Sequence, residues 1–266
     1  MRGKGSFKAT ALDHILAAQG VSSNGLSTRL RARAAGIIGA EVFLETQTCR
    51  WQGKGRIVDG NLFNRNELLA QKVIKGLESR NMRGFYAKDG DEAREIALEL
   101  IGEGASVGMG GCMSALEIGL VDALKEGPYT FIDRATYADQ RAALLDTYAA
   151  DAFLTSANAL TYDGVIVNID GNANRVSCIA QGPRKVVFIV GMNKLCCDLD
   201  SAMKRARNVA APANVQRFDI DTPCKKTGSC FDCKSPDTVC CQFLITRFSR
   251  HAGRINVVLV NEALGF

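Results

Sequence analysis

The chain has 266 residues and a formal net charge of +5, and 47% of its residues are hydrophobic and 23% charged. This is the composition of an ordinary globular protein with enough chain to bury a sizeable core. No apolar stretch of the sequence is long enough to span a bilayer, and the first residues lack the apolar core of a secretory signal. We therefore expect a cytoplasmic protein without a membrane span.

The positive charge lies at the beginning of the chain. Residues 1–60 hold nine Lys and Arg against four Asp and Glu, whereas residues 61–266 hold 24 residues of each sign. A body with balanced charge offers no basic face to a nucleic acid, so nucleic acid is not an expected partner. Because apolar periodicity is weak in residues 1–60, we expect a basic, poorly ordered extension there and a single domain over residues 61–266.

Helical patterns alternate with short apolar runs from residue 66 onward. Helices are expected at 66–78, 91–101, 139–148 and 198–208, and strands at 84–87, 105–107, 129–132, 152–155, 185–190, 242–247 and 255–260. The alternation predicts an α/β fold whose mainly parallel sheet is covered by helices on both faces. Two β-rich runs, 165–169 and 175–179, flank a turn and predict a hairpin within a β-rich insert.

A glycine turn lies between a strand and a helix in the stretch 107–124, VGMGGCMSALEIGLVDAL. Gly108, Gly110 and Gly111 leave backbone N–H groups bare, so this turn is predicted to hold an anionic ligand; a plain tight connection is the alternative. The pattern falls short of the full dinucleotide fingerprint. Ser114 and Glu117 match a capping box, which favours a capping role for Glu117, with a catalytic carboxylate as the alternative.

Polar side chains gather in the stretch that follows residue 155. If the strands at 105–107 and 152–155 are neighbours, these side chains lie near the glycine turn and would orient a small polar ligand, although Asn and Asp are also ordinary turn residues. Lys194 follows a buried strand and would meet an anion there, with an exposed lysine as the alternative. The predicted ligand-binding residues in this region are Asn158, Asp163, Asn168, Asp170, Asn172, Asn174 and Lys194.

Five of the ten cysteines lie within residues 224–241. In a reducing compartment, clustered cysteines indicate a metal or redox chemistry. Cys224, Cys230, Cys233 and Cys240 are the predicted metal ligands, with Cys241 as an alternative to Cys240. Both an iron–sulfur cluster and a structural zinc ion suit four thiolates, and the spacing does not separate them; reduced thiols without metal are the remaining alternative.

Four blocks occur in one order along the chain: VGMGGCMSALEIGLVDAL, SANALTYDGVIVNIDGNANRV, PRKVVFIVGMNKL and TPCKKTGSCFDCKSPDTVC. Together they resemble the lactate-utilisation (LUD) domain family, from about residue 66 to residue 266. The resemblance implies a fold akin to that of ribose-5-phosphate isomerase and coenzyme A transferases. It also implies a part in the oxidation of lactate to pyruvate, with iron–sulfur proteins as partners.

Two functions follow as expectations. The first is an enzyme or redox component that acts on lactate or a related small organic acid, or on a phosphorylated or coenzyme A-type anion, and carries an iron–sulfur cluster. The second is a non-catalytic accessory or regulatory protein with a structural zinc site. The sequence predicts no catalytic residue for either function.

Overall fold

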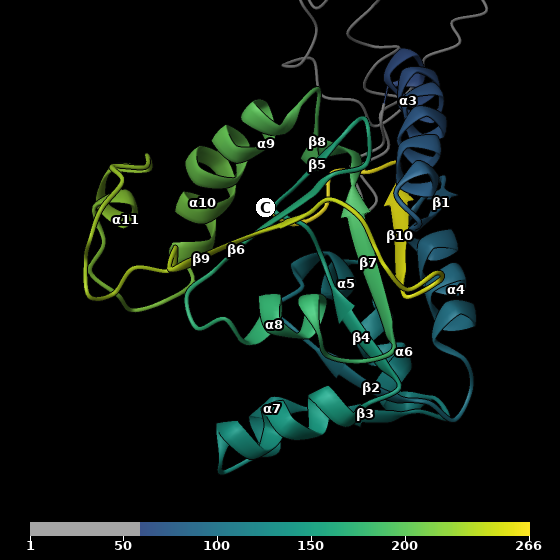
Figure 1. Cartoon of the computed structure of the whole chain (residues 1–266), viewed down its shortest axis with the longest axis horizontal. Helices are drawn as coiled ribbons and strands as arrows, with labels where there is room; N and C mark the ends of the chain where they lie inside the picture. The colour runs from purple at the N-terminus through teal and green to yellow at the C-terminus, as the bar shows by residue number, and fades with distance from the viewer. Residues whose placement is uncertain (1–58) are drawn as a thin grey trace, which may run out of the picture. The chain divides into compact units, whose positions relative to one another are not determined.

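A computed structural model describes residues 59–266 (Figure 1). The expected extension therefore lies outside the described residues except for its last two positions. The helices are α3 (Gly60–Ser79), α4 (Gly90–Ile101), α5 (Met113–Glu117), α6 (Leu120–Glu126), α7 (Gln140–Ala149), α8 (Asn174–Ala180), α9 (Leu199–Arg205), α10 (Ala211–Val215) and α11 (Pro223–Thr227). Short 3₁₀ turns occupy Arg134–Thr136 and Met192–Lys194, and a π-helical turn, Ala206–Ala210, joins α9 to α10.

The larger sheet has six strands, all parallel. Its order is β1-β10-β7-β4-β2-β3. The bounds of these strands are β1 (Arg83–Ala87), β2 (Ser106–Met109), β3 (Thr130–Ile132), β4 (Ala152–Thr155), β7 (Lys185–Gly191) and β10 (Ile255–Val260). The predicted parallel α/β sheet is confirmed.

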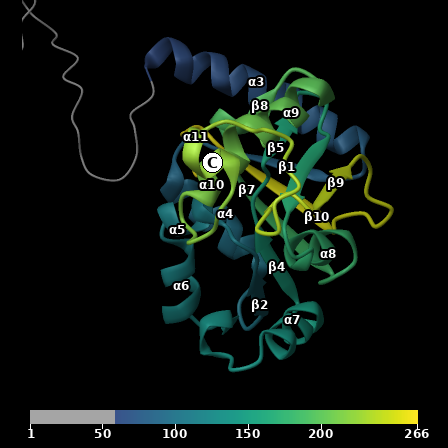
Figure 2. The ribbon, with the colours of Figure 1, turned by 90° about the vertical axis from the view of Figure 1, so that its left-hand side faces the viewer.

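Helices cover both faces of this sheet, as predicted. In the central strand β7, Val187 and Ile189 pack into one apolar cluster, with α4 and α6, while Val186 and Phe188 pack into another, with α3 and α8. Successive side chains of a strand point to opposite faces, so a strand buried on both faces reads as a continuous apolar run. Figure 2 shows α5 and α6 on one side of the sheet and α7 and α8 on the other.

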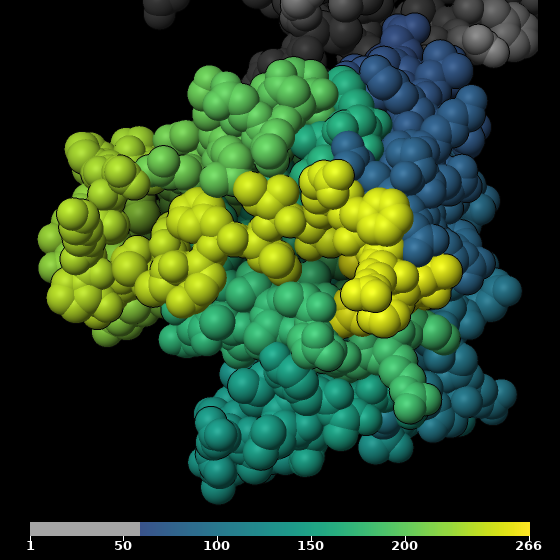
Figure 3. All heavy atoms as spheres, in the orientation of Figure 1, coloured from purple at the N-terminus to yellow at the C-terminus, as the bar shows by residue number. Residues whose placement is uncertain are grey.

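A second, mixed sheet has the order β8-β5-β6-β9, and two of its strands, β5 and β6, lie in the predicted β-rich insert. Its strands are β5 (Ala159–Thr161), β6 (Ile166–Asp170), β8 (Leu195–Cys196) and β9 (Gln242–Thr246). Figure 1 shows α9, α10 and α11 gathered on the side of this sheet that lies away from α3 and α4. The end of the chain runs across the face shown in Figure 3, where the yellow atoms cross the middle of the molecule.

The predicted hairpin of 165–169 with 175–179 is wrong, because the second run is the helix α8. The Asp170 carboxylate accepts the backbone N–H groups of Arg175 (2.9 Å) and Val176 (3.1 Å), and thereby starts the helix. Ala173 sits just before α8 with φ of 60°. The strand β6 pairs with β5 and β9 instead.

The helix expected after the glycine turn is divided in two. It breaks between α5 and α6 at Gly119, whose φ of 69° lies in the left-handed region that favours glycine. The predicted capping box does not form: Cys112 is the N-cap residue, and the Glu117 carboxylate accepts the backbone N–H of Gly265 at 2.7 Å. Among residues 59–266, no helix combines the length and the apolar character needed to cross a membrane.

Candidate functional site

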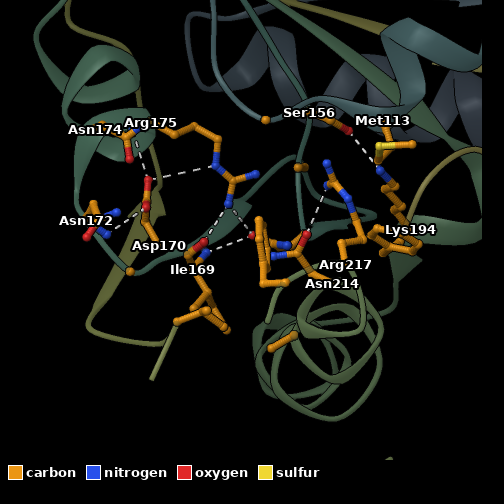
Figure 4. A pocket seen from close by; sticks show the side chains of 18 of the residues that line it. Met113, Ser156, Ile169, Asp170, Asn172, Asn174, Arg175, Lys194, Asn214 and Arg217 are labelled. Carbon is orange, nitrogen blue, oxygen red and sulfur yellow. Dashed lines mark hydrogen bonds and ion pairs between the residues drawn. The ribbon is translucent and has the colours of Figure 1, made fainter. Parts of the chain in front are cut away.

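A polar pocket of about 400 Å³ opens at the carboxyl ends of the central parallel strands (Figure 4). Ligands of open α/β sheets bind at this edge. Its wall combines residues that follow β2, β4, β6 and β7 with residues of α8, of α10 and of the end of the chain. Its lining residues include Gly111, Met113, Arg134, Ser156, Asn158, Ile169, Asp170, Gly171, Asn172, Asn174, Arg175, Lys194, Ala211, Asn214, Arg217 and Val239.

Six of the ten residues predicted to bind a ligand line this pocket. They are Gly111, Asn158, Asp170, Asn172, Asn174 and Lys194. Gly111, Asn158 and Lys194 follow the neighbouring strands β2, β4 and β7 of the parallel sheet, whereas the other three lie at or after the end of β6 in the second sheet. The side chains labelled in Figure 4 include Asp170, Asn172 and Asn174 on one side of the pocket and Lys194 on the other.

The other four predicted residues are not among those that line this pocket. A Cβ added to Gly108 would collide with Thr147, and one added to Gly110 would lie 2.8 Å from Arg175 Cγ. Asp163 lies away from the pocket, paired with Arg80, and hydrogen bonds from Thr161 and Arg80 hold its pKa below the usual value. Asn168 is fully buried, and its amide donates to the Ser156 carbonyl at 2.9 Å.

Lys194 is buried, with 2% of its surface exposed, and is not the exposed lysine of the alternative interpretation. Its Nζ donates to the hydroxyls of Ser156 (2.9 Å) and Ser114 (3.0 Å). Burial lowers the pKa of Lys194 to about 8, because an ammonium ion loses hydration in the interior. Near physiological pH the ammonium form therefore remains the larger population, and a minor fraction of the amine is neutral.

Arg175 links the polar loops of the pocket. Its guanidinium donates to Asn158 Oδ1 (2.9 Å) and to the Ile169 carbonyl (2.5 Å), and its Nε lies 4.0 Å from Asp170 Oδ2. Only 14% of the Arg175 side chain is exposed. Burial lowers its pKa from the ordinary value, yet an arginine remains charged at any physiological pH.

The pocket carries an excess of positive charge. Arg134, Arg175, Lys194 and Arg217 line it, and Asp170 is the side-chain carboxylate among its lining residues in the described part of the chain. Arg217 is exposed, and its guanidinium donates to Asn214 Oδ1 at 3.2 Å. Guanidinium groups bind carboxylates and phosphates through paired hydrogen bonds. The pocket is thus suited to a small anion.

Four pocket residues, Ser156 and the three arginines, are not predicted from the sequence. Ser156 and Arg175 belong to the block SANALTYDGVIVNIDGNANRV, but the sequence predicts a strand over 175–179, where a partly buried guanidinium has no evident role. Arg134 follows β3, and Arg217 follows α10. No local pattern marks Arg134 or Arg217, because only the tertiary fold brings their segments to the edge of the central strands.

A second, smaller cavity of about 60 Å³ is lined by Cys224, Cys230, Cys233 and Cys240, the four predicted metal ligands. Cys241 is exposed, and its backbone N–H donates to the Asp170 carbonyl at 3.0 Å. Burial, then the charges of the three neighbouring thiols, raise the pKa of Cys240 to about 11. Ala211 and Val239 line both cavities, which are therefore neighbours.

The described cysteines are all free of disulfides, but their thiols are not arranged in the coordination geometry of a metal site. Within residues 59–266, no group of three or more His, Cys, Asp or Glu side chains has an arrangement that holds a metal ion. Arg207 lies at the edge of the smaller cavity, where its guanidinium contacts Cys230 Sγ at 3.7 Å and Asp232 Oδ1 at 2.5 Å. The donor set fits a thiolate-bound metal, and binding would need the four side chains to draw together.

The chain is similar in sequence to one protein family and in structure to a solved protein. A crystal structure of a DUF162 family protein from Deinococcus radiodurans is similar over 74% of this chain and 98% of that one, with 13% identity and a TM-score of 0.43. No curated protein matches the chain. The sequence model of the LUD domain matches residues 70–260, which include both sheets, the cysteine cavity and all lining residues of the polar pocket except Phe266. The chain therefore belongs to the LUD domain family.

Proposed function

We propose that this protein binds a small organic acid of the lactate and pyruvate class in its polar pocket and takes part in the oxidation of such an acid. The excess of cationic side chains in a pocket of about 400 Å³ carries the proposal. A pocket of this size accepts a small molecule, and arginines give specific hydrogen bonds to a carboxylate. The family name supplies the link to lactate utilisation.

Calorimetric titration with L-lactate and with pyruvate tests this proposal. Arg217→Gln is the informative variant, because Arg217 is exposed and its truncation costs little folding energy. We expect Kd for pyruvate to rise roughly five-fold, the effect of about 1 kcal/mol from one lost charge-assisted hydrogen bond. Arg141→Gln, on the exposed side of α7, is the matched control and should leave Kd unchanged.

Failure of both acids to bind wild-type protein at millimolar concentration would contradict the proposal. Inorganic phosphate and coenzyme A, titrated in the same way, represent the other anions that the pocket charge suits. If phosphate or coenzyme A binds and neither lactate nor pyruvate does, the ligand of the pocket is that other anion and not a small organic acid.

The second part of the proposal is a metal held by Cys224, Cys230, Cys233 and Cys240. The shared cavity of these four thiols supports it, as does the absence of disulfides among the described cysteines. An iron–sulfur cluster at this place would supply electron transfer beside the pocket, whereas zinc would supply a structural crosslink. Four thiolates also suit a single zinc ion, which keeps the accessory protein with structural zinc as a second candidate.

Metal analysis after anaerobic purification separates the two candidates. Iron with sulfide and a brown colour supports the redox protein, and zinc without colour supports the accessory protein. Cys233→Ser should lower the bound metal well below one equivalent, while Cys241→Ser, whose exposed thiol lies outside the cavity, should retain it. Metal-free wild-type protein would contradict both candidates.

A further inference from the structure

Lys194 occupies an unusual place for a lysine. It ends the 3₁₀ turn after β7 and lies at the wall of the polar pocket, with 2% of its surface exposed. Lysines are almost never this buried unless they are paired. Lys194 has no carboxylate within ion-pair distance in the described part of the chain, so its burial is not explained by a salt bridge.

The two serines around Lys194 suit a neutral amine. Ser156 donates its own proton to the Ile189 carbonyl (2.6 Å), so it can only accept from Lys194, and Ser114 accepts a second N–H. A neutral amine has two N–H groups and one lone pair. With both N–H groups donated to serines, the lone pair is left free. Figure 4 shows the Lys194 side chain reaching Ser156 beside the pocket.

The charges that surround the amine come from three elements. Arg175 of α8 and Arg205 of α9 disfavour the ammonium form, whereas Glu117 of α5 and the Cys112 thiol at the N-cap of α5 favour it. Burial outweighs these opposing contributions and sets the direction, towards a pKa of about 8. A desolvated lysine near other cationic groups is the kind of amine that forms Schiff bases with carbonyl substrates.

We infer that Lys194 is a nucleophile that forms a Schiff base with the carbonyl group of a 2-keto acid held in the polar pocket. The inference rests on the proposed function, since it needs the pocket to accept a small organic acid. The Lys194 lone pair attacks the keto carbon, a C–N bond forms as the C=O π bond breaks, and one amine proton passes to the oxygen to give a hydroxyl. The C–O bond then breaks, and the hydroxyl leaves as water with the second amine proton. The imine remains, and no oxidant or reductant is consumed.

Reductive trapping tests the inference. Wild-type protein incubated with pyruvate and cyanoborohydride should gain the mass of one reduced adduct, and peptide mapping should place the adduct on Lys194. Lactate has no carbonyl group and should give no adduct under the same conditions. Lys194→Arg should abolish trapping, while Lys75→Arg, on the exposed side of α3, should leave it unchanged. Trapping should quicken as pH rises towards 8, because the neutral amine is the nucleophile.

Mapping on the wild-type protein keeps the inference testable even where Lys194→Arg fails to fold. An adduct spread over exposed lysines, or no adduct although pyruvate binds by calorimetry, would overturn the Schiff base and leave the proposed function standing. Absence of pyruvate binding altogether would instead overturn the proposed function.

Discussion

A lysine as buried as Lys194 destabilises the folded protein wherever its amine must carry a charge. Its pKa is about 8 in the folded state, against an ordinary value of 10.5 in the unfolded chain. Between these values the unfolded state binds more protons, so the free energy of unfolding rises as pH increases from about 8 to about 10.5. Below pH 8 both states are protonated, and the cost of burying the charge is fully present.

Replacement of Lys194 should therefore remove its contribution to the pH dependence of the free energy of unfolding. In urea unfolding from pH 7 to pH 10.5, wild-type stability should rise relative to that of Lys194→Met across the upper part of the range. Lys75→Met, at an exposed position, should follow the wild-type profile. Parallel profiles for wild type and Lys194→Met would mean that the amine titrates alike in the folded and unfolded states.

The sequence pointed to Lys194 as a residue that meets an anion, but it gave no sign of the burial. Its serine partners lie 38 and 80 residues away in the chain. Contacts at such separation follow from strand order and not from local pattern. For the same reason Arg134 and Arg217 could not be predicted as pocket residues. The polar residues that gather locally after strands could be predicted, and they include Asn158, Asp170, Asn172 and Asn174.

At the scale of elements, the two glycines of the turn after β2 differ in their surroundings: Gly110 is packed against other side chains, and Gly111 lines the pocket. A Cβ at Gly110 would lie 2.8 Å from Arg175 Cγ and 3.0 Å from Phe153 Cζ, whereas a Cβ at Gly111 meets nothing within 4 Å. Of the three glycines predicted to bind an anion, Gly111 lines the pocket, and Gly108 and Gly110 are not among its lining residues. The five-residue helix α5 is too short to add a helix dipole of consequence.

Alanine at these two positions should have different effects. Gly110→Ala should lower the free energy of unfolding by about 1–3 kcal/mol, the usual cost of overpacking, and should weaken anion binding by displacing Arg175. Gly111→Ala should change stability by less than about 0.5 kcal/mol. Chemical denaturation checks both values, and equal losses at the two positions would contradict the assigned roles.

At the scale of the whole molecule, the parallel sheet was predictable because apolar strands and amphipathic helices alternate along the sequence. The second sheet was only partly predictable. The strand β6 pairs with β9, which lies more than 70 residues later in the chain. The run 175–179, expected as a strand, belongs to the helix α8, because the Asp170 carboxylate accepts backbone N–H groups of its first turn. The four cysteines of the predicted metal site do share one cavity, and that cavity borders the polar pocket through Ala211 and Val239.

The structure of the protein crystallised with pyruvate is the most direct test of the organic-acid pocket. We predict density for one pyruvate between Lys194 and the arginines of the pocket, with its carboxylate on a guanidinium and its keto carbon towards Lys194 Nζ. An empty pocket at saturating pyruvate, or pyruvate bound elsewhere on the protein, would contradict the account.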